Sequence, residues 1–181
     1  MSSAKRPAAP PVPSGKMIEK TIQGISILVV DDNPYMRRVT RMMLVNLGAK
    51  SVIEAADGLA ALEAIRTRDP DIMLLDWDMP VLNGIEVLRI VRSPGVFPRP
   101  NLPTIMLTNR AHRGQVAEAM RAGVHEFLVK PTSPKALRDR LTSIVVNPRP
   151  MVKIGKYYVP RPRRARAQTR TAIRSAAKAA P

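Results

Sequence analysis

Three apolar runs that have the pattern of buried strands each end in charged side chains. They are residues 25–30 before Asp31 and Asp32, residues 72–75 before Asp76, and residues 126–129 before Lys130. Short runs of this kind are typical of strands in a parallel sheet that is covered on both faces. In such a sheet the carboxyl ends of the strands lie along one edge, and ligands bind just outside it. The sequence therefore predicts that three carboxylates and one ammonium group gather at a single edge.

Strand and helix patterns alternate from residue 25 to residue 146. We expect strands at 25–30, 51–55, 71–75, 104–107 and 126–129, and helices from Pro34 to near Gly48, from Asp57 to near Asp69, and at about 83–92, 112–122 and 134–146. Strands and helices that alternate across short connections form a parallel sheet with right-handed crossovers on both faces. The fold class is therefore α/β, but periodicity alone leaves the order of the strands open.

The basic charge is concentrated toward the carboxyl end of the chain. The 181 residues carry a net charge of +16, and residues 147–181 contain ten lysines and arginines and no acidic residue. We expect a disordered, proline-rich lead-in at residues 1–21, one domain at 22–146, and a basic extension at 147–181 that is partly docked and then disordered or helical.

The composition disfavours several kinds of site and location. The chain has no cysteine, which excludes disulfides, thiolate metal sites and cysteine nucleophiles. Its two histidines, His112 and His125, are expected at the surface and make a histidine-based metal site a poor match. No apolar run reaches the roughly 18 residues of a membrane-spanning helix, and no signal-peptide pattern opens the chain. We therefore expect a cytoplasmic protein without membrane insertion.

The predicted cluster of charges suits a divalent cation and a phosphoryl group. Three converging carboxylates repel one another unless a cation lies among them, and magnesium binds carboxylates together with phosphate oxygens. A carboxylate beside the metal can also act as a nucleophile, with Asp76 as the candidate and Lys130 as the cation opposite it. Taken alone, the pair Asp31 and Asp32 is more often a helix cap and its solvated neighbour. The cluster as a whole favours the metal site.

The segment from Leu74 to Gly84, with Asp31, Asp32, Thr108 and residues 127–131 in order, closely resembles the receiver domain of two-component response regulators. The match covers roughly residues 24 to 146. The resemblance implies a flavodoxin-like, doubly wound sheet of five parallel strands in the order 2-1-3-4-5, with helices on both faces. Asn109 and Thr132 depart from the residues common at those positions, which affects the switch face more than the site.

The resemblance also implies a role for each residue of the site. Asp76 would accept a phosphoryl group from the phosphohistidine of a histidine kinase. Asp32 and Asp76 would bind Mg²⁺ directly, Asp31 would bind it through water, and the backbone carbonyl of Asp78 would complete the protein ligands.

The resemblance also implies which residues would contact the phosphoryl group and which would change position in response to it. Lys130 and the hydroxyl of Thr108 would contact the phosphoryl group, and Phe127 would turn inward when Thr108 moves. Asp78 and Arg110 would tune the lifetime of the phosphoryl group. The Lys130–Pro131 peptide is expected to be cis.

The leading functional hypothesis is a phosphorylation-activated signalling switch that undergoes Mg²⁺-dependent self-phosphorylation and autodephosphorylation. Only 35 residues follow residue 146, too few for a separate catalytic output domain. Its partners would be a sensor histidine kinase or phosphotransfer protein, and an unknown downstream protein on the face of the fourth helix, fifth strand and fifth helix. Two alternatives are a nucleic-acid-binding regulator that acts through its basic tail, and a phosphate sink or relay intermediate.

The tail contains two distinct segments. Residues 151–159 combine apolar residues with two tyrosines, and we expect them to dock on the domain or on a partner. Farther on, cations recur every four residues, as Arg166, Arg170, Arg174 and Lys178. On a helix they would form a basic ridge for nucleic acid or an acidic protein. A solvated, disordered arm is the simpler alternative, because like charges at this spacing oppose an isolated helix.

Overall fold

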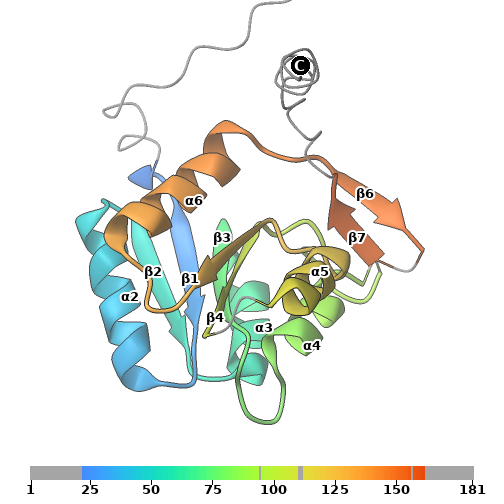
Figure 1. Cartoon of the computed structure of the whole chain (residues 1–181), viewed down its shortest axis with the longest axis horizontal. Helices are drawn as coiled ribbons and strands as arrows, with labels where there is room; N and C mark the ends of the chain where they lie inside the picture. The colour runs from blue at the N-terminus through green and yellow to red at the C-terminus, as the bar shows by residue number, and fades with distance from the viewer. Residues whose placement is uncertain (1–21, 94, 110–111, 156, 162–181) are drawn as a thin grey trace, which may run out of the picture.

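Five parallel strands form the central sheet of the computed structural model, which describes residues 22–93, 95–109, 112–155 and 157–161 (Figure 1). The strands are β1 (Ser26–Val30), β2 (Ser51–Ala55), β3 (Ile72–Asp76), β4 (Thr104–Thr108) and β5 (Glu126–Val129). Their order is β2-β1-β3-β4-β5. The predicted α/β class and strand order are confirmed.

The helices are α2 (Pro34–Asn46), α3 (Gly58–Arg68), α4 (Gly84–Val91), α5 (Arg113–Ala122) and α6 (Pro134–Val146). Polar side chains cap most of their first turns. Asn33 accepts hydrogen bonds from the first turn of α2, Asp57 caps α3, and Ser133 caps α6. Asn83 and Glu86 form a reciprocal capping box on α4. These caps set where four of the helices begin, whereas His112 before α5 makes no side-chain cap hydrogen bond.

Alternate residues of the strands enter two hydrophobic cores, one on each face of the sheet. The first core lies under α3, α4 and α5, and the second lies under α2 and α6 (Figure 1). In β1, for example, Leu28 faces the first core and Val29 faces the second, and both are fully buried. The double coverage accounts for the continuous apolar runs in the sequence.

A buried arginine ties the end of α4 to the beginnings of β4 and β5. The Arg92 side chain is fully buried and donates hydrogen bonds to the carbonyl oxygens of Pro100 at 2.9 Å, Leu102 at 2.8 Å and Gly123 at 3.0 Å. Burial lowers the pKa of Arg92 to about 9, which still leaves the guanidinium charged at neutral pH. One side chain thus satisfies backbone acceptors from three segments of the chain.

His125 lies beside Arg92 and is buried, so its expected surface position is wrong. Its exposed fraction is 7%, and its Nδ1 accepts a hydrogen bond from the backbone N–H of Thr104 at 3.2 Å. Burial, together with the nearby charges of Arg92 and Arg149, lowers the pKa of His125 to about 3. The imidazole is therefore neutral and serves as an acceptor within the fold. His112 is exposed, as expected.

Beyond the last helix the chain forms a small antiparallel hairpin of β6 (Met151–Ile154) and β7 (Tyr157–Pro160). The hairpin lies beside the carboxyl ends of α4 and α5 (Figure 1). The backbone N–H of Tyr158 donates to the carbonyl oxygen of Arg92 at 3.1 Å, and Val159 is buried. A Cβ at Gly123 would lie 2.8 Å from the carbonyl oxygen of Tyr158, so only glycine permits this close approach.

Within the described ranges, no helix is both long and apolar enough to cross a membrane. The basic ridge predicted at Arg166, Arg170, Arg174 and Lys178 lies outside the described residues, as does the lead-in at 1–21.

Candidate functional site

Three carboxylates meet at the carboxyl edge of the sheet. Asp31 follows β1 and Asp76 ends β3, and these adjacent strands pair in parallel with Val30 opposite Leu75. Each of Asp31, Asp32 and Asp76 offers a carboxylate oxygen, and these three atoms lie within 4.8 Å of one another. Asp31 and Asp76 are almost fully buried, whereas Asp32 is exposed. The strand ends thus bring together the three acidic residues singled out in the sequence.

Lys130 bridges the two buried carboxylates. Its Nζ lies 2.7 Å from Oδ2 of Asp31 and 2.8 Å from Oδ2 of Asp76. Burial alone would lower the pKa of Lys130, but its hydrogen bonds to the two carboxylates outweigh burial and raise it. The Lys130 side chain therefore stays protonated. The Lys130–Pro131 peptide that follows is cis, which confirms the expectation.

Asp76 keeps one oxygen available. Its Oδ1 is buried and has no hydrogen-bond partner among the described residues. In Asp31, by contrast, Oδ1 accepts from the backbone N–H of Asn33 at 2.9 Å and Oδ2 accepts from Lys130. Burial raises the pKa of Asp76, and the hydrogen bond and charge of Lys130 oppose that rise only in part. Oδ1 of Asp76 is therefore a buried oxygen that still needs a cation or a hydrogen-bond donor.

The donor set fits Mg²⁺. When all three carboxylates are ionised, one lysine leaves a formal excess of two negative charges, which one divalent cation balances. Carboxylate oxygens are the hard ligands that Mg²⁺ prefers, and Asp32 at the exposed side of the cluster leaves room for water ligands. A bound cation would also offset the burial that raises the pKa of Asp76.

Thr108 and Phe127 lie on the next two strands of the sheet. Thr108 ends β4 and is fully buried, and its carbonyl oxygen accepts from the backbone N–H of Lys130 at 2.7 Å. Phe127 in β5 is partly buried and packs against the first hydrophobic core. Asp78 is exposed two residues beyond Asp76, and Arg110 lies outside the described residues.

Three further residues, Asn33, Arg37 and Gly84, shape the site. Asn33 orients the Asp31 carboxylate, as described above. Arg37 donates to the carbonyl oxygens of Asp31 at 2.7 Å and Asp32 at 3.3 Å, which fixes the turn after β1. A Cβ at Gly84 would lie 2.2 Å from the carbonyl oxygen of Asp76, so glycine is required where α4 begins. Its place at the end of the Asp76 loop is a signal that the sequence already carries.

Comparison with known proteins identifies the family of the chain. The family model described as the response regulator receiver domain matches residues 27–142. The chain belongs to this family. Its receiver domain is 38% identical over 122 residues to chemotaxis protein CheY-3 of Vibrio cholerae serotype O1, covering 67% of this chain and 92% of that protein. It is also 38% identical over 120 residues to chemotaxis protein CheY of Pseudomonas aeruginosa, covering 66% and 95%.

Solved structures agree with this assignment of the receiver domain. CheY4 of Vibrio cholerae superimposes with a TM-score of 0.61 at 30% identity, covering 66% of this chain and 98% of that one. The receiver domain of sensor histidine kinase PA1611 from Pseudomonas aeruginosa, solved with a magnesium ion in its active-site cleft, gives a TM-score of 0.61 at 31% identity and covers 68% and 98%. The family model ends at residue 142, before the β6–β7 hairpin begins.

Proposed function

We propose that the protein is a phosphorylation-activated response regulator that accepts a phosphoryl group on Asp76 from the phosphohistidine of a histidine kinase or phosphotransfer protein. The observation that supports this proposal most strongly is the environment of Asp76. Lys130 holds one carboxylate oxygen at 2.8 Å, while the other oxygen, Oδ1, is buried without a partner among the described residues. One oxygen is thus held in place and the other is available as a nucleophile.

The transfer moves one phosphoryl group between two side chains. An oxygen of Asp76 forms a bond to phosphorus as the phosphorus–nitrogen bond of the phosphohistidine breaks, and the imidazole leaves with its electron pair. The Lys130 ammonium, already 2.8 Å from Asp76, would lie beside the oxygens on which negative charge is spread. Asp31, Asp32, Asp76 and the Asp78 carbonyl would hold Mg²⁺, which supplies charge neutralisation at the same oxygens.

The response to phosphorylation would pass through Thr108. Its hydroxyl would move toward a phosphoryl oxygen, and Phe127 on the neighbouring strand would fill the space that this movement opens. The surface formed by α5, β5 and α6 would then bind the downstream protein. Asp78 and Arg110 would control how readily water reaches the acyl phosphate.

The only tryptophan of the chain gives a direct test of magnesium and phosphoryl binding. Trp77 follows Asp76, and we expect its fluorescence to change on addition of Mg²⁺ and to change again when beryllofluoride is added with Mg²⁺. Titrations of Asp32→Asn with Ca²⁺ and Mg²⁺ are compared with those of the wild type. This substitution removes one charge from the acidic cluster and leaves the buried carboxylates of Asp31 and Asp76 intact. Identical titrations of the wild type and Asp32→Asn, or no response to beryllofluoride, would argue against the proposed site.

A further inference from the structure

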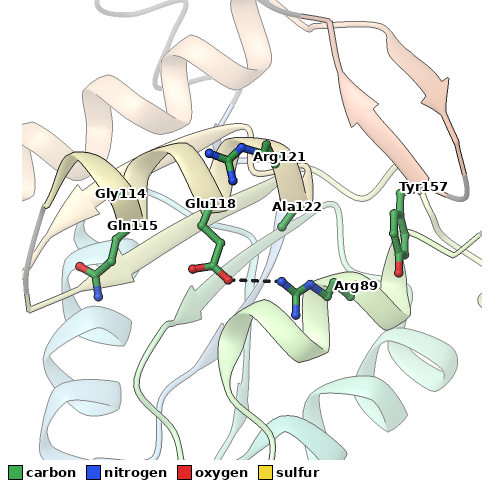
Figure 2. Close-up of a pocket in the computed structure, with 7 residues that line it drawn as sticks. All are labelled: Arg89, Gly114, Gln115, Glu118, Arg121, Ala122 and Tyr157. Atoms are coloured by element: carbon green, nitrogen blue, oxygen red, sulfur yellow. Dashed lines mark hydrogen bonds and ion pairs between the residues drawn. The ribbon is translucent and has the colours of Figure 1, made fainter.

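A groove of about 710 Å³ lies between α4 and α5, and the β6–β7 hairpin closes one of its ends. Figure 2 shows Arg89 of α4 reaching across to Glu118 of α5, with Tyr157 of β7 beside α4. The groove lies on the α4 side of α5, away from the acidic cluster. It is also distinct from the face of α5, β5 and α6 that carries the proposed switch.

The charges in the groove are unevenly matched. Arg89 pairs with Glu118 at 3.2 Å, and both side chains are about half exposed, so water screens the pair. Arg121 on α5 is exposed and has no ion-pair partner among the described residues. The groove therefore has one cation in excess, and Arg89 can exchange Glu118 for another carboxylate at little cost.

The remaining walls offer an aromatic ring and an unsatisfied amide. The Tyr157 side chain is 39% exposed and presents both a ring face and a hydroxyl. The Oε1 atom of Gln115 is buried without a hydrogen-bond partner in the part of the chain that the structure describes. A bound backbone N–H would satisfy this oxygen after a small rotation of the side chain. These groups suit a polypeptide ligand.

Tyr157 belongs to the part of the chain that lies beyond the family match. The hairpin is held against the domain by the hydrogen bond from Tyr158 to the Arg92 carbonyl and by burial of Val159. Its position is therefore fixed relative to α4 and α5. The extension adds a wall to a surface that the receiver domain alone would leave open.

We propose that this groove is a docking site for an acidic, apolar-containing segment of a partner protein. Carboxylates of the segment would pair with Arg121 and Arg89, and an apolar side chain would lie on the ring of Tyr157. Nucleic acid is the poorer match, because its phosphate backbone carries no N–H donor for Oε1 of Gln115, whereas a polypeptide backbone does.

Binding of an acidic peptide to the full-length chain tests the proposal. The probe is a dye-labelled synthetic peptide of aspartate, glutamate and leucine with one central tryptophan, and fluorescence anisotropy gives its Kd. We expect Arg121→Glu and Tyr157→Ala each to weaken binding about tenfold or more, and Tyr157→Phe to retain it. Arg38→Glu makes the same charge change on the exposed side of α2, beyond the opposite face of the sheet, and should leave the Kd unchanged.

Three results would overturn the proposal. One is a wild-type Kd in both Arg121→Glu and Tyr157→Ala. Another is a loss of binding in Arg170→Glu alone, which would place the peptide on the basic arm. The third is displacement of the peptide by a single-stranded DNA oligonucleotide whose own binding shows the same dependence on Arg121 and Tyr157. Asp76→Asn should bind the peptide like the wild type, so a failure of this proposal can be told apart from a failure of the proposed phosphorylation.

Discussion

Replacing Lys130 with methionine is expected to slow the phosphorylation of Asp76 by acetyl phosphate about 10²–10³-fold, the usual effect of removing one preorganised charged or hydrogen-bonding group from a transition state. Methionine keeps much of the length and apolar volume of the lysine stem but removes the ammonium group that lies 2.7 Å from Asp31 and 2.8 Å from Asp76. The buried carboxylates then lose their shared countercharge, and the pKa of Asp76, already raised by burial, rises further. A protonated Asp76 is a poor nucleophile.

The control for this substitution is Lys135→Met. Lys135 lies on α6, where its side chain is 77% exposed and pairs with Asp139 at 2.9 Å, so its loss should leave the rate unchanged. Rates are measured from the initial formation of acyl phosphate at fixed Mg²⁺, after circular dichroism has shown that both variants are folded. Equal rates in Lys130→Met and Lys135→Met would mean that Lys130 has no part in the transfer.

Replacing Arg92 with methionine is expected to lower the free energy of unfolding by at least about 3 kcal/mol, since each buried acceptor left without a donor costs about 1–3 kcal/mol. The substitution removes the donors to the carbonyl oxygens of Pro100, Leu102 and Gly123. Methionine fills much of the volume but donates no hydrogen bond. The loss should therefore come from unsatisfied backbone groups more than from a cavity.

Arg89→Met, in the last turn of α4, is the matched control for Arg92→Met. Arg89 is half exposed and pairs with Glu118, an interaction of the kind that contributes about 0–1 kcal/mol. Urea denaturation followed by circular dichroism gives both free energies. If the two variants lose the same stability, the buried network around Arg92 does not have the structural role described above.

The sequence predicted the sheet and the acidic edge because both depend on local patterns. Apolar runs of strand length, glycines after helices and capping residues before them all lie within a few positions of the elements that they define. The third strand was expected to end at residue 75, but it continues through Asp76, whose backbone pairs with Leu107 of β4. Strand pairing across the sheet decided that boundary, and no local pattern contains that information.

The buried polar network was beyond the reach of local patterns. Arg92 lies 33 positions from His125 in the chain, and taken alone each is a residue type that is commonly exposed. Only the fold brings Arg92 beside the backbone carbonyls that satisfy it. The same reason applies to Arg37, whose hydrogen bonds to the turn after β1 depend on the first turn of α2 being in place.

Residues 151–159 were expected to dock on the domain or on a partner, but their hairpin was not predicted. Each of its strands has only four residues, and apolar and polar residues do not alternate clearly along them. The pairing of Val152 with Val159 therefore left no pattern in the sequence. The position of the hairpin depends on Gly123, where the absence of a side chain admits the Tyr158 backbone. The need for glycine at position 123 arises from a contact with a residue 35 positions away in the chain, so neither local sequence reveals it.

The central claim is that Asp76 is the residue that receives the phosphoryl group, and mass spectrometry tests it most directly. The full-length protein is incubated with acetyl phosphate and Mg²⁺, the acyl phosphate is trapped by borohydride reduction, and the modified residue is identified by peptide fragmentation. We predict a single modification, at Asp76, that is absent from Asp76→Asn and from the wild type in excess chelator. Modification of a different residue, or undiminished labelling of Asp76→Asn or of the chelated wild type, would contradict the account.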